Sequence, residues 1–151
     1  MILVAGGDSF IWGSELADCL HGGTDGYSRS TFPALLATNY ICAAYPGIGN
    51  FEINRRVRSY LNWIRNDVFV LVCWTWPSRD GFLDSDNAIQ NLQEYLEHHK
   101  YLYMFTCADN CVITGKLDYT NWFMFPPAPA TTEPRGFYQW ARENKYLCGP
   151  E

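Results

Sequence analysis

Basic residues are scarce in this sequence, and it contains no long apolar run. The chain has 11 Lys and Arg residues against 16 Asp and Glu, a formal net charge of -5, and no basic stripe. A phosphate backbone is a poor partner for such a chain, so we expect no nucleic-acid binding. Apolar runs such as residues 68–74 are far shorter than the ~20 residues of a membrane span. No basic signal-peptide region precedes the first apolar run, so we expect no membrane span and a cytoplasmic location.

Motifs for cofactors and metals are also missing. The segment "GGDSFIWG" (6–13) lacks the Gly-Lys-Ser/Thr ending of a Walker loop and departs from the dinucleotide-binding glycine pattern. Cys107 and Cys111 are spaced like zinc ligands, but no second Cys or His pair accompanies them. We therefore expect no cofactor and no metal. Of the six cysteines, Cys42, Cys73 and Cys107 lie in apolar runs, which favours reduced, buried thiols.

Strand-like and helical segments alternate along the chain. The short apolar segments are residues 2–5, 40–45, 68–74 and 101–107, with a weaker fifth at 121–125. The helical segments are expected over 10–20, 31–38, 51–65 and 86–99, with a last fragment after residue 136. This order predicts one α/β domain over residues 1–151, with an open parallel sheet of about five strands and helices on both faces. In such sheets the chemistry gathers at the carboxyl ends of the strands.

The first of these strand ends carries the tripeptide Gly7-Asp8-Ser9. A serine that follows a buried strand and precedes a helix lies at the carboxyl edge of the sheet, where backbone N–H groups favour negative charge. This is the geometry that a nucleophile and an oxyanion need. The simpler interpretation is that Asp8 or Ser9 only caps the following helix.

A second glycine turn, "AYPGIGN" (44–50), leaves the second strand and enters a helix near Asn50. With these two turns the sequence resembles the SGNH (GDSL-type) hydrolase family. The resemblance implies a flavodoxin-like, three-layer α/β/α fold and esterase, lipase or carbohydrate-deacetylase chemistry on a small-molecule or glycan ester. It implies Ser9 as nucleophile, with its own N–H and that of Gly47 as oxyanion donors and Gly49 as the alternative to Gly47. Asp8 and Asn50 are included among the residues expected at this oxyanion and substrate site.

The third block of the family, Gly-x-Asn-Asp, has no counterpart here. Alignment of the strand ends places "WTWP" (74–77) on it, so that Trp76 stands where the oxyanion Asn would be. We expect the Thr75 hydroxyl, the Trp76 indole N–H or Asn50 to replace that donor. Loss of one such donor costs ~10²–10³ in rate and does not by itself abolish the chemistry.

A base for the serine is harder to find, because the chain has only three histidines. His98 and His99 end the helix before the fourth strand, so we expect them at the amino edge, opposite Ser9. We expect His21 in a surface loop beyond the first helix. The family carries its base in an Asp-x-x-His block near the C-terminus, and this chain ends at "KYLCGPE" without one. We expect a truncated chain, a base from another chain or lost catalysis, and in each case little esterase activity from this chain.

Other interpretations use the same sheet edge. A non-catalytic module could use Trp74 and Trp76 as a carbohydrate platform, and a flavodoxin-like phosphate or nucleotide binder is a third alternative. Arg79 and Asp80, in the loop after the third strand, are expected to form a surface pair, with a contact to the substrate as the alternative. A chain without the closing helix leaves apolar sheet surface uncovered, which favours a homo-oligomer.

Overall fold

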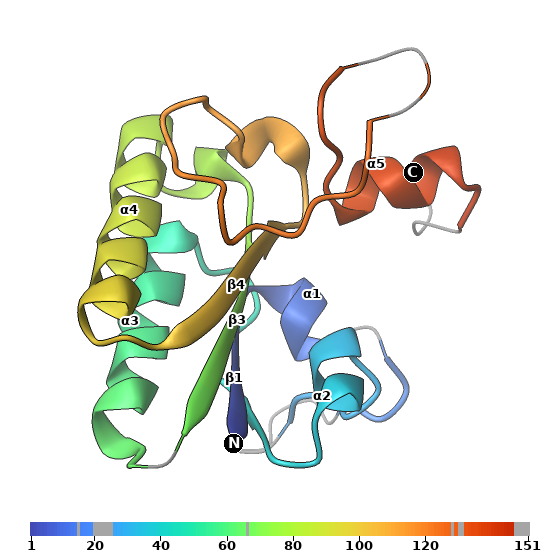
Figure 1. The fold of residues 1–151 in the computed structure, drawn as a ribbon. Coiled ribbons are helices and arrows are strands. Elements are labelled where there is room, and N and C mark those ends of the chain that lie inside the picture. The colour runs from blue at the N-terminus through green and yellow to red at the C-terminus, as the bar shows by residue number, and fades with distance from the viewer. Residues whose placement is uncertain (15, 20–25, 66, 128, 130–131, 147–151) are drawn as a thin grey trace.

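A sheet of four parallel strands forms the centre of the molecule in a computed structural model (Figure 1). The structure describes residues 1–151 apart from 15, 20–25, 66, 128, 130–131 and 147–151. The strands are β1 (Ile2–Gly6), β2 (Tyr40–Cys42), β3 (Val68–Trp74) and β4 (Leu102–Cys107), and their order across the sheet is β2-β1-β3-β4. This confirms the expected α/β class with a parallel sheet.

The strand order makes β1 the point at which the chain changes direction across the sheet. Val4 of β1 is in register with Ile41 of β2 on one side and with Val70 of β3 on the other. The connection after β1 therefore leads to one side of that strand, and the connection after β2 returns to the other side. Ligands of open α/β sheets bind at such a switch point, outside the carboxyl ends of the strands.

Two long helices, α3 (Asn50–Trp63) and α4 (Phe82–His98), cover one face of the sheet (Figure 1). Apolar residues recur every three or four positions along them, which gives each helix one apolar stripe. The buried side chains of this layer include Ile53, Val57, Leu61, Ile89, Leu92 and Leu96. They pack against the alternate β3 residues Val68, Val70 and Val72. Among the described residues, no helix combines the length and hydropathy needed to cross a bilayer.

The opposite face of the sheet is covered by shorter helices, which completes three layers. These are α1 (Ser9–Trp12) and α2 (Phe32–Leu36), while α5 (Phe137–Glu143) lies beyond the carboxyl end of the sheet and packs against this layer through Phe137 (Figure 1). Two single-turn helices, η1 (Pro77–Arg79) and η2 (Asn110–Val112), follow β3 and β4. The cover is incomplete over the edge strand, because the side chains of Leu102 and Met104 on β4 are exposed.

Two elements differ from the sequence prediction. The expected helix over 10–20 is only α1, which ends because Gly13 has a left-handed backbone (φ 77°) and donates its N–H to the Ser9 carbonyl. The weaker strand candidate, 121–125, forms no strand and contributes one parallel bridge from Trp122 to Phe105, with a second bridge from Phe125 to Arg135. The other predicted strands and helices are present with small changes at their ends.

Candidate active site at the carboxyl edge of the sheet

Gly7 allows the turn between β1 and α1 to pass close to its neighbours. A Cβ at Gly7 would lie 2.3 Å from Ile11 Cγ1, inside α1, and 3.2 Å from the carbonyl oxygen of Cys73 on β3. Any larger residue would push α1 away from the sheet. The next residue, Asp8, caps α1 by accepting a hydrogen bond from the backbone N–H of Phe10 at 3.0 Å. The expected capping role of Asp8 is therefore confirmed, and Ser9 is the first residue of α1, with a half-buried side chain.

The buried carboxylate of Asp8 joins the β1 turn to the loop after β3. It accepts a hydrogen bond of 2.6 Å from the Thr75 hydroxyl, and Arg79 Nη1 lies 3.2 Å from the same oxygen, Oδ2. A buried carboxylate is costly unless it is paired and hydrogen-bonded, and these contacts supply both. The carboxylate only accepts hydrogen bonds, so in this arrangement Asp8 fixes the turn that carries Ser9.

Asn50 holds the loop after β3 from the other side. Its side-chain N–H groups donate to the Thr75 carbonyl at 3.0 Å and to Ser85 Oγ at 2.7 Å. Its side-chain oxygen accepts from the Thr75 N–H at 2.9 Å. Asn50, Thr75 and Ser85 are all fully buried. Two of the three side chains expected to act as oxyanion donors, the Asn50 amide and the Thr75 hydroxyl, are thus engaged inside the protein. The predicted role of these two groups and of the Trp76 indole stays a prediction.

Arg79 lies between the two glycine turns. Its Nη1 donates to the Ile48 carbonyl at 2.8 Å as well as facing Asp8, and its guanidinium is 5.7 Å from the centre of the Trp76 ring. Arg79 and Asp80 do not form the expected surface pair. Asp80 instead accepts a hydrogen bond from the N–H of Phe51 at the start of α3, at 3.0 Å. The cationic side chain of Arg79 therefore lies beside Asp8, the residue that precedes Ser9.

The second turn contains two glycines with different roles. Gly47 has a left-handed backbone (φ 77°), and a Cβ there would meet nothing within 4 Å. At Gly49, a Cβ would lie 2.1 Å from a carboxylate oxygen of Asp80, so the absence of a side chain lets Asp80 reach the start of α3. Gly47 is the exposed glycine of the turn, as the predicted oxyanion role requires, and that role remains a prediction.

The two tryptophans of the third loop differ in exposure. Trp74 is fully buried and makes an edge-to-face contact with Phe105, with the two ring centres 5.2 Å apart. Its ring therefore has no free face, and the expectation that it forms a carbohydrate platform with Trp76 is wrong. The reason is that Trp74 is the last residue of the central strand β3 and points into the layer of α3 and α4. Trp76, two positions beyond the last residue of β3, is half-buried beside Arg79.

An aromatic cluster lies on the α1 side of Ser9. Phe10, which follows Ser9, is 46% exposed, and its ring centre is 5.3 Å from that of Phe137 and 6.3 Å from that of Phe32. Phe125 extends the cluster at 5.1 Å from Phe137. These rings come from α1, α2, α5 and the segment before α5, so they place apolar surface next to the serine.

The described histidines lie away from Ser9. His98 is the last residue of α4, and His99 packs against Tyr95 with ring centres 4.4 Å apart. Both residues precede the amino end of β4, as predicted, at the edge of the sheet opposite the Ser9 turn. His21 lies outside the described residues.

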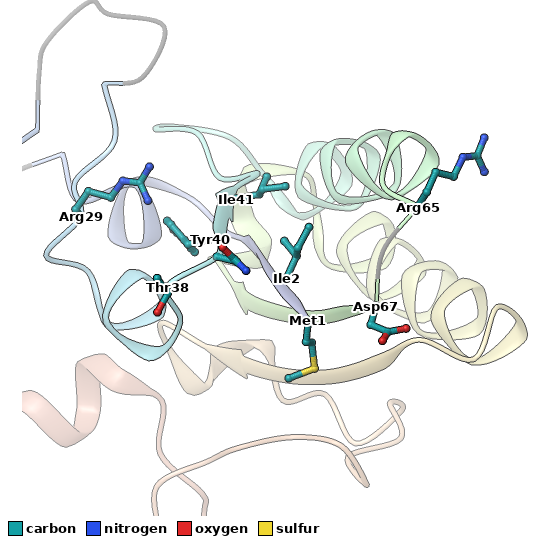
Figure 2. A pocket seen from close by; sticks show the side chains of 9 residues that line it. Met1, Ile2, Arg29, Thr38, Tyr40, Ile41, Arg65 and Asp67 are labelled. Carbon is teal, nitrogen blue, oxygen red and sulfur yellow. The ribbon is translucent and has the colours of Figure 1, made fainter.

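A polar hollow of about 750 Å³ also lies at the amino edge and is separate from the Ser9 turn (Figure 2). It is bordered by the starts of β1 and β2 and by Asp67, with Arg29 and Arg65 on opposite sides in Figure 2. Arg29 already stacks on Tyr27, with its guanidinium 5.2 Å from the ring centre.

A search of protein-family models, curated proteins and solved structures finds no match to the chain.

Sequence reasoning did not find the contact from Arg79 to Asp8 or the part that Ser85 plays. The signal in the sequence for Arg79 was its place in the loop after the third strand, at the same sheet edge as the Ser9 turn. The contact of Ser85 with Asn50 joins residues 35 positions apart and has no local sequence signature.

Proposed function

We propose that this chain is a serine-hydrolase-like domain of the SGNH type, whose Ser9 takes part in acyl transfer from small-molecule or glycan esters. The observation that carries the proposal is the anchoring of the Ser9 turn at the switch point of the sheet. Asp8 is held by Thr75, Arg79 and the Phe10 N–H, and this arrangement leaves the following serine at the half-buried start of α1. A rigid turn of this kind supplies the orientation that nucleophilic catalysis needs.

The surroundings of Ser9 suit an acyl ester. The exposed ring of Phe10 and the aromatic cluster behind it offer an apolar surface for an acyl group. The Gly47 turn, held by the contact of Arg79 with the neighbouring Ile48 carbonyl, lies at the same edge of the sheet. Its N–H and that of Ser9 are the proposed donors to an oxyanion.

In the proposed reaction, Ser9 Oγ forms a bond to the ester carbonyl carbon and the C=O electron pair moves onto the oxygen. Collapse of this intermediate expels the alkoxide, which takes a proton from water and leaves an acyl-serine. Water then attacks the acyl-serine, which releases the acid and restores the hydroxyl. The proton of Ser9 must go to a base, and no described histidine lies at this edge, so hydroxide from solvent takes it. The reaction of this chain is therefore slow at neutral pH.

Labelling with a fluorophosphonate followed by peptide mass spectrometry tests the proposal. We expect slow modification at Ser9, none in Ser9→Ala, and an unchanged rate in Ser78→Ala, which removes an exposed serine of the neighbouring loop. Equal labelling of the wild type and Ser9→Ala would contradict the proposal. Binding of glycans that survives Ser9→Ala but is lost in Trp76→Ala would favour the non-catalytic alternative.

A further inference from the structure

We propose that the guanidinium of Arg79 is an oxyanion donor of the Ser9 site and takes the place of the family asparagine that this chain lacks. The inference rests on the proposed function, because it assigns a donor to the same reaction. Arg79 comes from the loop after β3, the loop that carries the third block in the family, three positions beyond Trp76.

The position of Arg79 favours this role. One guanidinium nitrogen, Nη1, contacts both Asp8 Oδ2 at 3.2 Å and the Ile48 carbonyl at 2.8 Å. Asp8 precedes the nucleophile Ser9, and Ile48 follows the oxyanion glycine Gly47. The guanidinium therefore bridges the two turns that supply the proposed backbone donors.

The hydrogen bonds of the neighbouring side chains also favour Arg79. The Thr75 hydroxyl donates to Asp8, and the Asn50 amide donates to the Thr75 carbonyl and to Ser85, so two of the three predicted replacements have spent their hydrogens. The third, the Trp76 indole, lies beside Arg79, with its ring centre 5.7 Å from the guanidinium. In the described part of the chain, Arg79 uses only Nη1, which leaves its Nε and Nη2 hydrogens free. The side chain is 30% exposed, so a ligand can reach these hydrogens.

The local charges permit a transient negative charge here. The carboxylate that contacts the guanidinium is that of Asp8, which also accepts from Thr75 and Phe10, whereas the Asp80 carboxylate accepts from the N–H of Phe51. Asp8 orients the guanidinium through Nη1, and the planar fork directs the remaining N–H groups away from that contact. Charge that develops on an ester carbonyl oxygen during attack would then be met by an already oriented cation.

A pair of phosphonylating probes that differ in one atom tests the role of Arg79. A phosphonofluoridate presents P=O to the oxyanion donors, and the corresponding phosphonofluoridothioate presents P=S, whose sulfur is a weak acceptor. In each case Ser9 Oγ bonds to phosphorus, fluoride leaves, and the serine proton goes to hydroxide. We divide the rate of Ser9 labelling by the P=O probe by the rate with the P=S probe, and compare this ratio with the same ratio for hydrolysis of the two probes by hydroxide. The difference measures hydrogen bonding from the protein to the P=O oxygen.

We expect Arg79→Lys, which keeps the charge beside Asp8 and loses the planar fork, to slow P=O labelling at least tenfold, since losing one donor typically costs ~10²–10³ in rate. The P=S probe should slow much less, so the ratio falls. Arg55→Lys on the exposed side of α3 is the matched control and should leave the ratio unchanged. Arg79→Gln provides a second variant, and thermal unfolding by circular dichroism shows which variants are folded.

A folded Arg79 variant that slows both probes equally, or slows neither, would overturn the oxyanion role and leave the proposed function standing. If Ser9→Ala is labelled as fast as the wild type by both probes, the proposed function itself fails. These outcomes are distinct, because the first concerns a ratio at Ser9 and the second concerns whether Ser9 reacts at all.

Discussion

The Thr75 hydroxyl donates a 2.6 Å hydrogen bond to the Asp8 carboxylate across 67 positions of sequence. This bond links the ends of the two central strands, β1 and β3, at the switch point of the sheet. Both side chains are buried, so the bond is shielded from water. The turn that carries Ser9 is consequently fixed by buried residues at the strand ends, and Arg79 of the loop after β3 adds a further contact to Asp8.

Replacement of Thr75 by valine tests this link. Thr75→Val keeps the shape of the side chain and removes the donor, which leaves one bond of the buried Asp8 unmade. We expect the free energy of unfolding to fall by about 2 kcal/mol, in the range for a hydrogen bond to a buried charged group. Urea unfolding measures the change, with Thr38→Val at an exposed position as the control. An equal stability for the two variants would contradict the structural role given to this bond.

Asn50 is expected to be more important for stability. Asn50→Ala removes two donors and one acceptor and leaves the Thr75 N–H, the Thr75 carbonyl and Ser85 Oγ without these partners in a buried place. Each unsatisfied buried group costs about 1–3 kcal/mol, so we expect a loss of about 3 kcal/mol or more. Asn91→Ala, at an exposed position of α4, should change the unfolding free energy far less. Chemical denaturation measures the free energy of unfolding of both variants. If Asn50→Ala loses no more of it than Asn91→Ala, the stabilising role given to Asn50 is wrong.

The two turn glycines should respond differently to alanine. Gly7→Ala places a methyl group against Ile11, and overpacking of this kind costs about 1–3 kcal/mol and moves α1, so Ser9 labelling should fall with stability. Gly47→Ala has free space and only the cost of a left-handed backbone, about 1–2 kcal/mol. Thermal unfolding with parallel labelling separates the two effects. If Gly7→Ala labels as fast as the wild type, the turn geometry is not what positions Ser9.

Cys111 should be an unreactive thiol despite its exposure. The residue as a whole is exposed but its thiol is partly buried. This partial burial and then the hydrogen bond and charge of Asp109 raise the pKa of Cys111 to about 12, so little thiolate exists at pH 8. We expect alkylation by iodoacetamide to be slower than that of a free cysteine by about tenfold or more, and to accelerate as the pH rises. Asp109→Asn removes the carboxylate charge and should lower the pKa and speed the reaction. Peptide mass spectrometry at Cys111 measures the rate, and an unchanged rate in Asp109→Asn would refute this cause.

The sheet could be predicted from the sequence because strands buried on both faces are continuous apolar runs, as in residues 68–74. The length of α1 could not be predicted from the sequence. The left-handed backbone at Gly13 ends the helix, but a glycine can also occur inside a helix, so the residue alone does not mark the end. For the site, the Ser9 turn and the Gly47 turn follow from local residues. The partners of Asp8 are residues from the far end of β3, and no local pattern encodes such a contact.

The burial of Trp74 could not be predicted from the sequence either. The sequence places Trp74 at the end of the predicted strand and Trp76 two positions later, and this pattern does not show which ring the helices of the fold cover. β3 ends at Trp74, as predicted, and the layer of α3 and α4 covers its ring, which packs in the core against Phe105.

The pH dependence of fluorophosphonate labelling at Ser9, followed from pH 6 to pH 9, tests the central claim most directly. We expect modification at Ser9 alone, absent in Ser9→Ala and unchanged in His21→Ala, with a rate that rises about tenfold per pH unit because hydroxide takes the proton. Rapid labelling at pH 7 that reaches a plateau would show that a protein base serves Ser9. Labelling that is the same in the wild type and Ser9→Ala would contradict the account altogether.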